Sequence, residues 1–288
     1  MGARHHVHLV RHRPGPALAG LVAGVVGMSE RAPGPVRRRQ PAGSLLPLVV
    51  SFGDPLRIDA HSDAVEARGT YRSFFAGFST GHALTRFDGG QDCVQVYLTP
   101  LGARRLLSAP GVELARRVVR VDDVAARLGH GLTDRVGEAA TWTERFALVE
   151  AALVEQAAAQ RSGAPPWVEW MWEQIVASGG RAAIGPLVRA TGWSQRHATT
   201  VFEREIGLTP KQAAGVVRFE AAAADLGRLP AAEVAARHGY YDQSHLSRAV
   251  ARYAGETPGE LAAARRPTAL TALGGPVSAD DEGRAARR

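Results

Sequence analysis

The sequence contains a single cysteine, Cys93, among 288 residues. One thiol cannot form a disulfide within the chain, and it cannot supply the several thiolates of a structural zinc site. The sequence also has no run of 18 apolar residues, so no membrane-spanning helix is predicted. Its first residues lack the apolar core and cleavage site of a secretory signal. We therefore expect a globular, cytoplasmic protein with no membrane partner.

Lysine is as scarce as cysteine, because Lys211 stands alone beside 34 arginines. The net charge is +7, but most of the basic excess lies in residues 1–60, which hold 8 basic and 3 acidic side chains. Residues 167–266 hold 12 basic and 10 acidic side chains. Total charge alone therefore does not predict nucleic-acid binding. A DNA reader with this charge would depend on base contacts or on dimerisation.

Motifs of several enzyme classes are also missing. There is no G-x-S-x-G, no P-loop and no G-x-G-x-x-G. Four histidines near the start are expected to belong to a mobile basic arm rather than a metal site; they are His5, His6, His8 and His12. Four further candidate ligands have no tight ligand spacing; they are His61, His82, Asp88 and Asp92. We predict no catalytic residue, no cofactor and no metal.

The C-terminal part contains a repeat with an offset of 48 residues, except at the opening glycines, Gly192 and Gly239, which are 47 residues apart. The second copy reads G-Y-Y-D-Q-S-H-L-S-R at 239–248 and is closed by G-E-T-P at 255–258. The first copy reads G-W-S-Q-R-H at 192–197 and is closed by G-L-T-P at 207–210. A repeat of this period indicates a duplicated supersecondary unit.

The second copy has the pattern of a helix, a tight turn and a second helix. Residues 231–238 form the first helix, Gly239 stops it, and Asp242 is the expected N-cap of the next one. One face of that helix is apolar, with Leu246, Ala249, Val250 and Tyr253 at helical spacing. The opposite face carries Gln243, Ser244, Ser247, Arg248 and Arg252. Arginine suits guanine edges and glutamine suits adenine edges, and each good pair contributes about 1–3 kcal/mol of discrimination.

The first copy follows the same pattern with weaker reading residues. Its second helix buries Ala198, Val201, Phe202 and Ile206, and it exposes Arg196, His197, Thr199, Thr200 and Arg204. Thr200 is the counterpart of Arg248, so this copy lacks a strong base-reading side chain. Residues 210–228 between the copies are predicted to form a continuous helix of about 18 residues, or about 27 Å. Such a connector would hold the two reading helices roughly one DNA turn, about 34 Å, apart.

Residues from about 170 to 266 resemble the C-terminal DNA-binding domain of the AraC/XylS family of bacterial transcription regulators. The resemblance implies two helix-turn-helix units joined by a linker helix, which read consecutive major-groove segments of double-stranded DNA. By position it implies base reading by Arg196, Thr199 and Thr200 in the first unit, and by Gln243, Ser244 and Arg248 in the second. Arg204, Ser247 and Arg252 lie on the same faces and complete the predicted DNA-binding set. Arg218 matches a linker-helix position that is usually structural. The chain departs from the family pattern at Pro186, Ala198 and Thr200.

The first half is predicted to be rich in β-structure. Strands are expected at 44–52, 71–78, 83–87 and 93–99, and alternation in the last predicts a half-buried strand. Arg37, Arg38 and Arg39 are interpreted as a solvated turn. A helical section is expected to begin at 101, and further helices are expected over 122–128 and 142–160. This half loosely resembles the sensor-like domain of some AraC/XylS regulators, through the segment Y-L-T-P-L-G-A-R-R-L-L. That resemblance implies a small-molecule effector, a homodimer and contact with RNA polymerase as further partners.

The sequence thus predicts an α+β fold with a β-rich N-terminal domain followed by helices, and then an all-α C-terminal domain of two helix-turn-helix units. The expected boundaries are an arm at 1–15, the sensor-like domain at 16–160, a linker at 161–166, the DNA-binding domain at 167–266 and a flexible tail at 267–288. The predicted function is non-enzymatic, sequence-specific transcription regulation. Two alternatives are a cupin-like β-barrel enzyme with a DNA-binding appendage and an alkyltransferase repair protein. The second needs several cysteines, and Cys93 is single.

Overall fold

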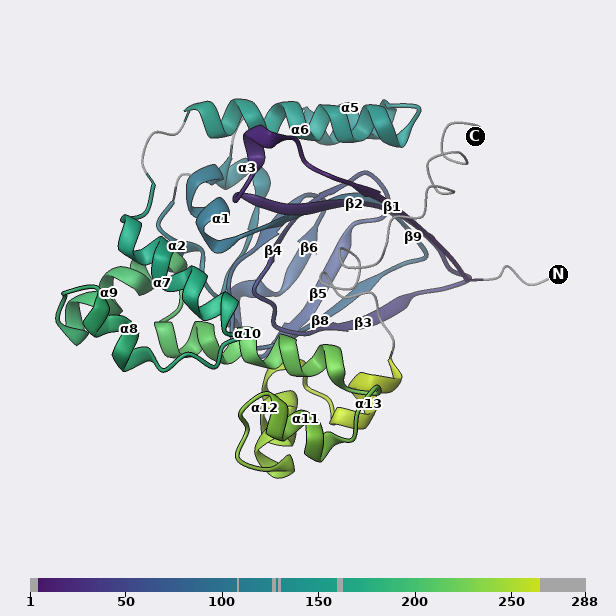
Figure 1. Ribbon diagram of the computed structural model, residues 1–288. Coiled ribbons are helices and arrows are strands. Elements are labelled where there is room, and N and C mark those ends of the chain that lie inside the picture. The colour runs from purple at the N-terminus through teal and green to yellow at the C-terminus, as the bar shows by residue number, and fades with distance from the viewer. Residues whose placement is uncertain (1–4, 108, 126–127, 129–130, 160–162, 265–288) are drawn as a thin grey trace.

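The computed structural model describes residues 5–107, 109–125, 128, 131–159 and 163–264. Strands dominate the first hundred residues and helices make up most of the remainder (Figure 1). The predicted α+β class, with a β-rich part before an all-helical part, is confirmed. None of the described helices combines the length and apolar character that crossing a membrane would require.

The larger of two antiparallel sheets has β9 and β4 at its centre. Hydrogen bonds along β9 run to β2 on one side and to β4 on the other. The order of its strands is β1 (His6–His12), β2 (Val22–Arg31), β9 (Gly90–Leu98), β4 (Leu46–Ser51), β7 (Phe74–Ala76) and β10 (Val118–Arg120).

The smaller sheet contains four strands, and β8 and β5 form its middle. A bulge between Ile58 and Ala60 shifts the register of β5 against β8. The order is β3 (Val36–Gln40), β8 (Ala83–Phe87), β5 (Leu56–His61) and β6 (Gly69–Tyr71). Two short 3₁₀ helices each lie between strands of one sheet: η1 (Pro16–Leu18) between β1 and β2, and η2 (Val65–Ala67) between β5 and β6.

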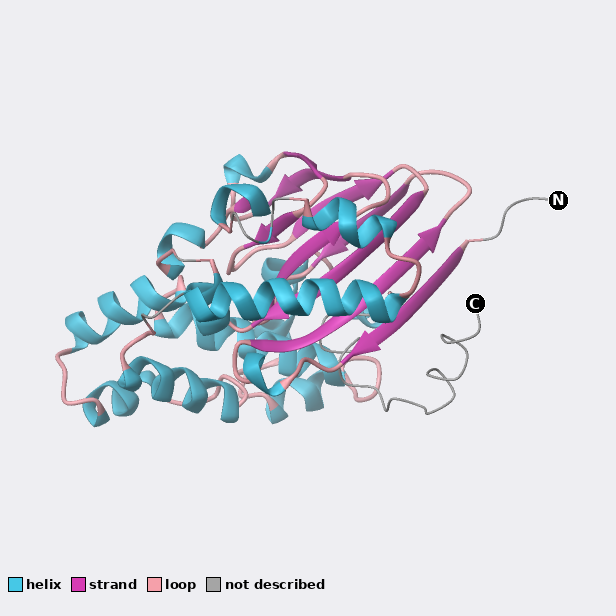
Figure 2. Ribbon diagram, turned by 90° about the horizontal axis from the view of Figure 1, so that it is seen from above, coloured by secondary structure: helices cyan, strands magenta, loops and turns pink. Residues whose placement is uncertain are grey.

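The strand β9 is buried on both faces, so the prediction of a half-buried strand was wrong. Val94 and Val96 belong to the main core, which also includes Phe146 and Leu153 of α6 (Trp142–Ala159). Cys93, on the opposite face, packs in a second cluster with residues of the smaller sheet. Figure 2 shows α6 lying along the strands of the larger sheet. Alternation alone could not reveal that a helix and a second sheet would cover the two faces.

Short helices follow β9 and lead toward α6. Thr99 caps the first of them, because its Oγ1 accepts a hydrogen bond from the backbone N–H of Gly102 at 2.9 Å. The helix expected at 122–128 is shorter, ending at Val124, and residues 126–127 lie outside the described part of the chain. These helices are α1 (Pro100–Leu106), α2 (Gly111–Leu114), α3 (Val121–Val124) and α5 (Leu132–Glu138).

The C-terminal helices form two pairs, α8–α9 and α11–α12, at opposite ends of α10 (Figure 1). The predicted connector is confirmed as a single helix, but it ends at Asp225 rather than Arg228. Residues of both halves share one core, which includes Phe75 of β7, Phe202 of α9 and Phe219 of α10. The helices are α7 (Pro166–Ala177), α8 (Ile184–Ala190), α9 (Gln195–Ile206), α10 (Pro210–Asp225), α11 (Ala231–Arg237), α12 (Gln243–Ala254) and α13 (Pro258–Ala263).

Two sequence interpretations in the first half were wrong. The segment His6–His12 is the strand β1, paired with β2, rather than part of a mobile arm. The ring of His12 stacks on Phe146 at 4.9 Å, and its Nε2 lies 2.7 Å from Oε2 of Glu150. The arginines at 37–39 belong to the strand β3 rather than a turn, and Arg38 pairs with the fully buried Glu30. Residues 1–4 of the predicted arm, 161–162 of the predicted linker and the whole predicted tail at 267–288 lie outside the described residues.

Candidate nucleic-acid interface

The second repeat unit has the geometry of a helix-turn-helix. Gly239 has φ of 70° after α11, a left-handed conformation that costs glycine little. Asp242 caps α12, because its Oδ1 accepts a hydrogen bond from the backbone N–H of His245 at 2.6 Å. Leu246 and Val250 are fully buried and fix the inner face of α12. The opposite face of α12 is therefore presented to solvent at a defined angle.

The predicted reading residues of this unit differ in what they contact. Gln243, Ser244 and Arg248 are exposed. The Oγ of Ser247 donates a hydrogen bond to the Gln243 carbonyl at 2.9 Å, so its donor is used within the helix. Arg252 donates from Nη2 to Oγ1 of Thr80 at 3.3 Å, and its guanidinium lies 5.4 Å from the ring centroid of Tyr253. The amino-terminal half of α12 thus offers the freest surface.

The first unit repeats this geometry. Ser194 caps α9 by accepting a hydrogen bond from the backbone N–H of His197 at 3.3 Å. Arg196 and Thr200 are exposed, while Oγ1 of Thr199 accepts a hydrogen bond from Gln195 at 3.3 Å. Arg204 is exposed, but its Nη2 lies 2.7 Å from Oε1 of the buried Glu205. Among the predicted reading residues of α9, Arg196 and Thr200 are therefore the two without a side-chain partner in the described part of the chain.

The repeat in sequence corresponds to a repeat in structure. The helices α9 and α12 begin and end 48 residues apart. Each ends at a left-handed glycine, Gly207 with φ of 99° and Gly255 with φ of 68°. Thr209 and Thr257 then form capping boxes that begin α10 and α13. Because these glycines and capping boxes are local features, the sequence alone predicts that each Thr-Pro pair begins a new helix.

Both recognition helices contact the N-terminal half at their C-terminal ends. We call the first contact the α9 junction, formed by Arg104 and Gly111. Arg104 donates from Nε to Oε2 of Glu205 at 2.9 Å. Gly111 lies so close to α9 that a Cβ on it would be 2.3 Å from the Glu205 carbonyl oxygen. The first unit is therefore joined to the helices that follow the sheet.

The α12 junction is formed by Arg39, Ala42, Thr80 and His82. Arg39 donates from Nη1 to the carbonyl of Gly255, and the backbone N–H of Ala42 donates to the Tyr253 carbonyl at 2.8 Å. The ring of His82 lies against Gly255, where an added Cβ would be 2.4 Å from Nε2. Together with the Arg252–Thr80 bond, these contacts join the last turn of α12 to the sheets. None of these partners was predicted, because they are distant in sequence.

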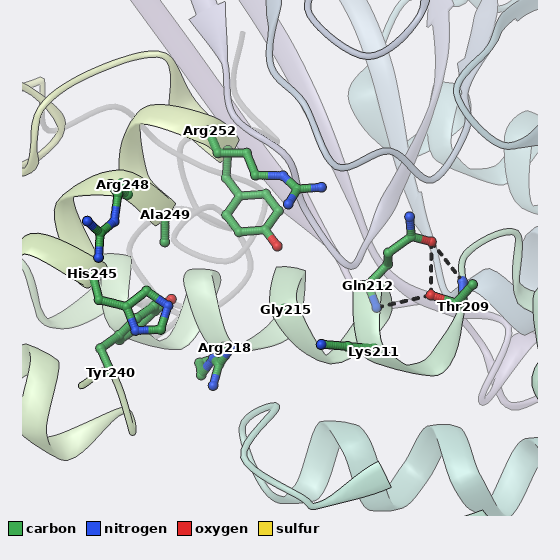
Figure 3. A pocket seen from close by; sticks show the side chains of 11 residues that line it. Thr209, Lys211, Gln212, Gly215, Arg218, Tyr240, His245, Arg248, Ala249 and Arg252 are labelled. Atoms are coloured by element: carbon green, nitrogen blue, oxygen red, sulfur yellow. Dashed lines mark hydrogen bonds between the residues drawn. The ribbon is translucent and has the colours of Figure 1, made fainter. Parts of the chain in front are cut away.

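A groove of about 480 Å³ lies between α10 and α12 (Figure 3). Its lining includes His245 and four cationic side chains, which are Lys211, Arg218, Arg248 and Arg252. Tyr240 also lines it, 5% exposed, with Arg218 at 5.1 Å over its ring. Sequence reasoning missed this groove, although the single lysine at the start of a helix was a visible signal.

The candidate metal ligands of the first half are dispersed or already bonded. Nε2 of His61 lies 3.4 Å from Oγ of Ser79, and Asp92 forms an ion pair with Arg31 at 2.6 Å. Among the residues described, no three His, Cys, Asp or Glu side chains gather in a metal-binding arrangement. Burial raises the pKa of the Cys93 thiol to about 12, so this thiol stays protonated near neutral pH.

Residues 187–264 match the family model described as "Helix-turn-helix domain". The chain is similar to the solved C-terminal domain of AraT, a response regulator from Geobacillus stearothermophilus, at 24% identity, covering 38% of this chain and 94% of that one with a TM-score of 0.34. It is also similar to ToxT from Vibrio cholerae, at 9% identity over 89% of this chain and 97% of that one with a TM-score of 0.43. A structure of wild-type ToxT from Vibrio cholerae strain SCE256 with an unsaturated fatty acid bound matches at 7% identity over 80% and 95%, with a TM-score of 0.39. No curated protein matches the chain.

The matched region and the geometry of its two units define a DNA-binding transcription regulator of the helix-turn-helix class. Its matched residues form an AraC-type helix-turn-helix domain, which contains α9 to α13 whole and α8 from Leu187 onward.

Proposed function

We propose that this protein reads two adjacent major-groove segments, with α9 in one and α12 in the other, and that its N-terminal half controls whether both helices engage. The observation that carries the first part is the pair of equivalent, capped helices at the two ends of α10. The length of α10 is about 24 Å at 1.5 Å per residue, with α9 directly before its first turn and α12 packed against its side at Phe219. A separation near one DNA turn, about 34 Å, is compatible with this arrangement.

The N-terminal half would act through the two junctions. Both junctions hold the C-terminal ends of the reading helices, so a change in the sheets or in α1 and α2 could shift either helix. A small-molecule effector would work by altering one of these contacts. The identity of such an effector, a homodimer and a contact with RNA polymerase stay predictions from the family resemblance.

Binding without catalysis is the other part of the proposal. A methyl-accepting thiol must be a reachable thiolate, whereas Cys93 is buried and its pKa is raised to about 12. The burial of Cys93 therefore argues against the repair alternative on chemical grounds. Turnover of a substrate by the purified chain would contradict this part.

The test is selection of DNA from a random pool by the purified full chain at physiological salt. We expect two short motifs spaced about one helical turn apart. A motif that matches only the second unit would mean that the first unit, which contains Thr200, has a structural role and reads no bases. No enrichment in any condition would contradict the proposed function.

Control of DNA binding by the N-terminal half is tested with a separate variant at the α12 junction. Thr80→Val removes the hydroxyl that accepts from Arg252 and keeps the side-chain volume. If the α12 junction controls engagement, this variant changes the affinity for the selected site. The matched control is Ser79→Ala, which removes a neighbouring hydroxyl that bonds His61 and Gly81 instead of α12. Equal affinities for all three proteins would contradict control through this bond.

A further inference from the structure

The groove between α10 and α12 gathers positive charge without acidic partners. Lys211 and Arg218 come from α10, whereas Arg248 and Arg252 come from the facing side of α12 (Figure 3). Among the described residues, no carboxylate lies within ion-pair distance of Lys211, Arg218 or Arg248. The other ion pairs of the C-terminal helices involve Arg204, Arg237 and His238. The charge of the groove is therefore uncompensated.

Two buried polar atoms at the groove have no hydrogen-bond partner among the described residues. They are Nε of Arg218 and Oη of Tyr240, and the Tyr240 side chain is only 5% exposed. Buried donors are nearly always bonded in native proteins, and an acceptor that entered the groove would bond both of these donors. Stacking of Arg218 on the Tyr240 ring accounts for the position of the guanidinium, and no described acceptor bonds Nε of Arg218 or the O–H of Tyr240.

Lys211 stands where a cation does not help the fold. It is the second residue of α10, directly after Pro210, and it is exposed. The amino-terminal end of a helix carries partial positive charge, which disfavours a cation there. This lysine is also the only one in the chain. Its position is thus better explained by an anionic ligand than by helix stability.

We propose that this groove is a phosphate-binding site and that it takes a backbone phosphate of the bound DNA. The inference rests on the proposed function and deepens it, because it makes α10 a DNA-contacting element rather than a spacer. Guanidinium groups and a phenol O–H are suited to the several oxygens of a phosphate. Arg248 lines the groove and also lies on the exposed face of α12, so a phosphate here would sit beside the major groove that α12 reads.

The single lysine provides a direct footprint. The full chain is treated with an amine-acetylating reagent, and the peptide that contains Lys211 is quantified by mass spectrometry. A duplex with the selected site should protect Lys211, and a scrambled duplex at the same salt should protect it less. Inorganic pyrophosphate alone is the second arm. Protection by pyrophosphate and not by DNA would assign the groove to a free phosphoanion instead of the backbone.

Two variants separate a binding role from a structural one. Lys211→Gln should make the negative slope of log K against log salt concentration shallower by about 0.9, which is the value for one lost phosphate contact. The change should be the same on specific and on non-specific DNA. The matched control is Arg135→Gln, an exposed arginine on α5 far from the groove, which should keep the slope. Tyr240→Phe keeps the ring beneath Arg218 and removes only the unpaired hydroxyl, so it should weaken DNA binding without lowering the melting temperature.

The outcomes divide as follows. DNA binding with an unprotected Lys211, an unchanged slope for Lys211→Gln and full affinity for Tyr240→Phe would overturn the site while leaving the proposed function intact. Failure of the whole chain to select DNA, together with protection of Lys211 by pyrophosphate, would overturn the proposed function and leave a phosphoanion site.

Discussion

Arg104 of α1 and Glu205 of α9, 101 residues apart, are joined by a hydrogen bond of 2.9 Å from Nε to Oε2. Glu205 is 4% exposed, and its carboxylate forms ion pairs with this arginine and with Arg204. The bond makes the first helix-turn-helix unit part of the same folded body as the sheets.

Replacing Arg104 by alanine should therefore destabilise the full chain. Removing one partner of a buried ion pair costs about 3–5 kcal/mol, and the retained Arg204 should hold the loss toward about 3 kcal/mol. The measurement is the urea midpoint of unfolding. The double variant Arg104→Ala with Glu205→Gln should recover part of the loss, because it removes the uncompensated charge. A midpoint equal to that of the parent protein would contradict the importance of this bond.

Gly111→Ala should separate α2 from α9. A Cβ at this position would lie 2.3 Å from the backbone carbonyl oxygen of Glu205, and backbone cannot move aside cheaply. Overpacking of this kind costs about 1–3 kcal/mol. Gly34→Ala is the matched control, because a Cβ there meets nothing within 4 Å. Thermal melts of the two variants should differ by several degrees, and identical melts would argue against close packing at the α9 junction.

Glu220 should make stability depend on pH. Burial of this carboxyl raises its pKa from 4.5 to about 7, although hydrogen bonds from Ser44 act in the opposite direction. A carboxyl whose pKa is raised in the folded state contributes fully to the free energy of unfolding at pH values below its unfolded-state pKa. This contribution is lost as the pH rises through its folded-state pKa. The contribution of Glu220 to unfolding free energy should thus fall between pH 4.5 and about 7 and stay level above that. Glu220→Gln should flatten that part of the profile, and parallel profiles for the two proteins would contradict the assignment.

Arg248→Ala should reduce specific binding by about 1–3 kcal/mol and relax one base position in the selected motif. Arg248→Lys keeps the charge and loses the planar fork, so it should retain non-specific affinity and still lose base preference. Binding is measured by fluorescence anisotropy on the selected duplex and on single-base variants. If both substitutions left the base preference intact, Arg248 would not read a base.

The C-terminal elements could be predicted from sequence because their signals are local. Gly239, Asp242 and the Thr257-Pro258 exit each determine backbone geometry within a few residues, and the structure has them where the pattern placed them. The strands β1 and β3 were missed because histidine and arginine runs favour solvent unless a partner strand supplies hydrogen bonds. Their residues gain those bonds only after chain segments distant in sequence have met.

The candidate site was predictable in part for the same reason. The exposed positions of Gln243, Ser244 and Arg248 follow from helical spacing. The partners of Arg204 and Arg252 do not, because Glu205 is buried by α1 and α2, and Thr80 comes from the sheets. The groove depends on how α10 packs against α12, which no local pattern specifies.

The two junctions and α10 have a mechanical consequence. The sheet half is fastened to α9 and to α12, while α10 links these two helices, so the three bodies form a closed triangle. A triangle of stiff members has no internal degree of freedom, and its sides cannot slide independently. We expect the distance between the reading helices to change most when one of the two junctions breaks. A signal that reaches this protein would then be expressed as a discrete step between two geometries rather than as a graded adjustment.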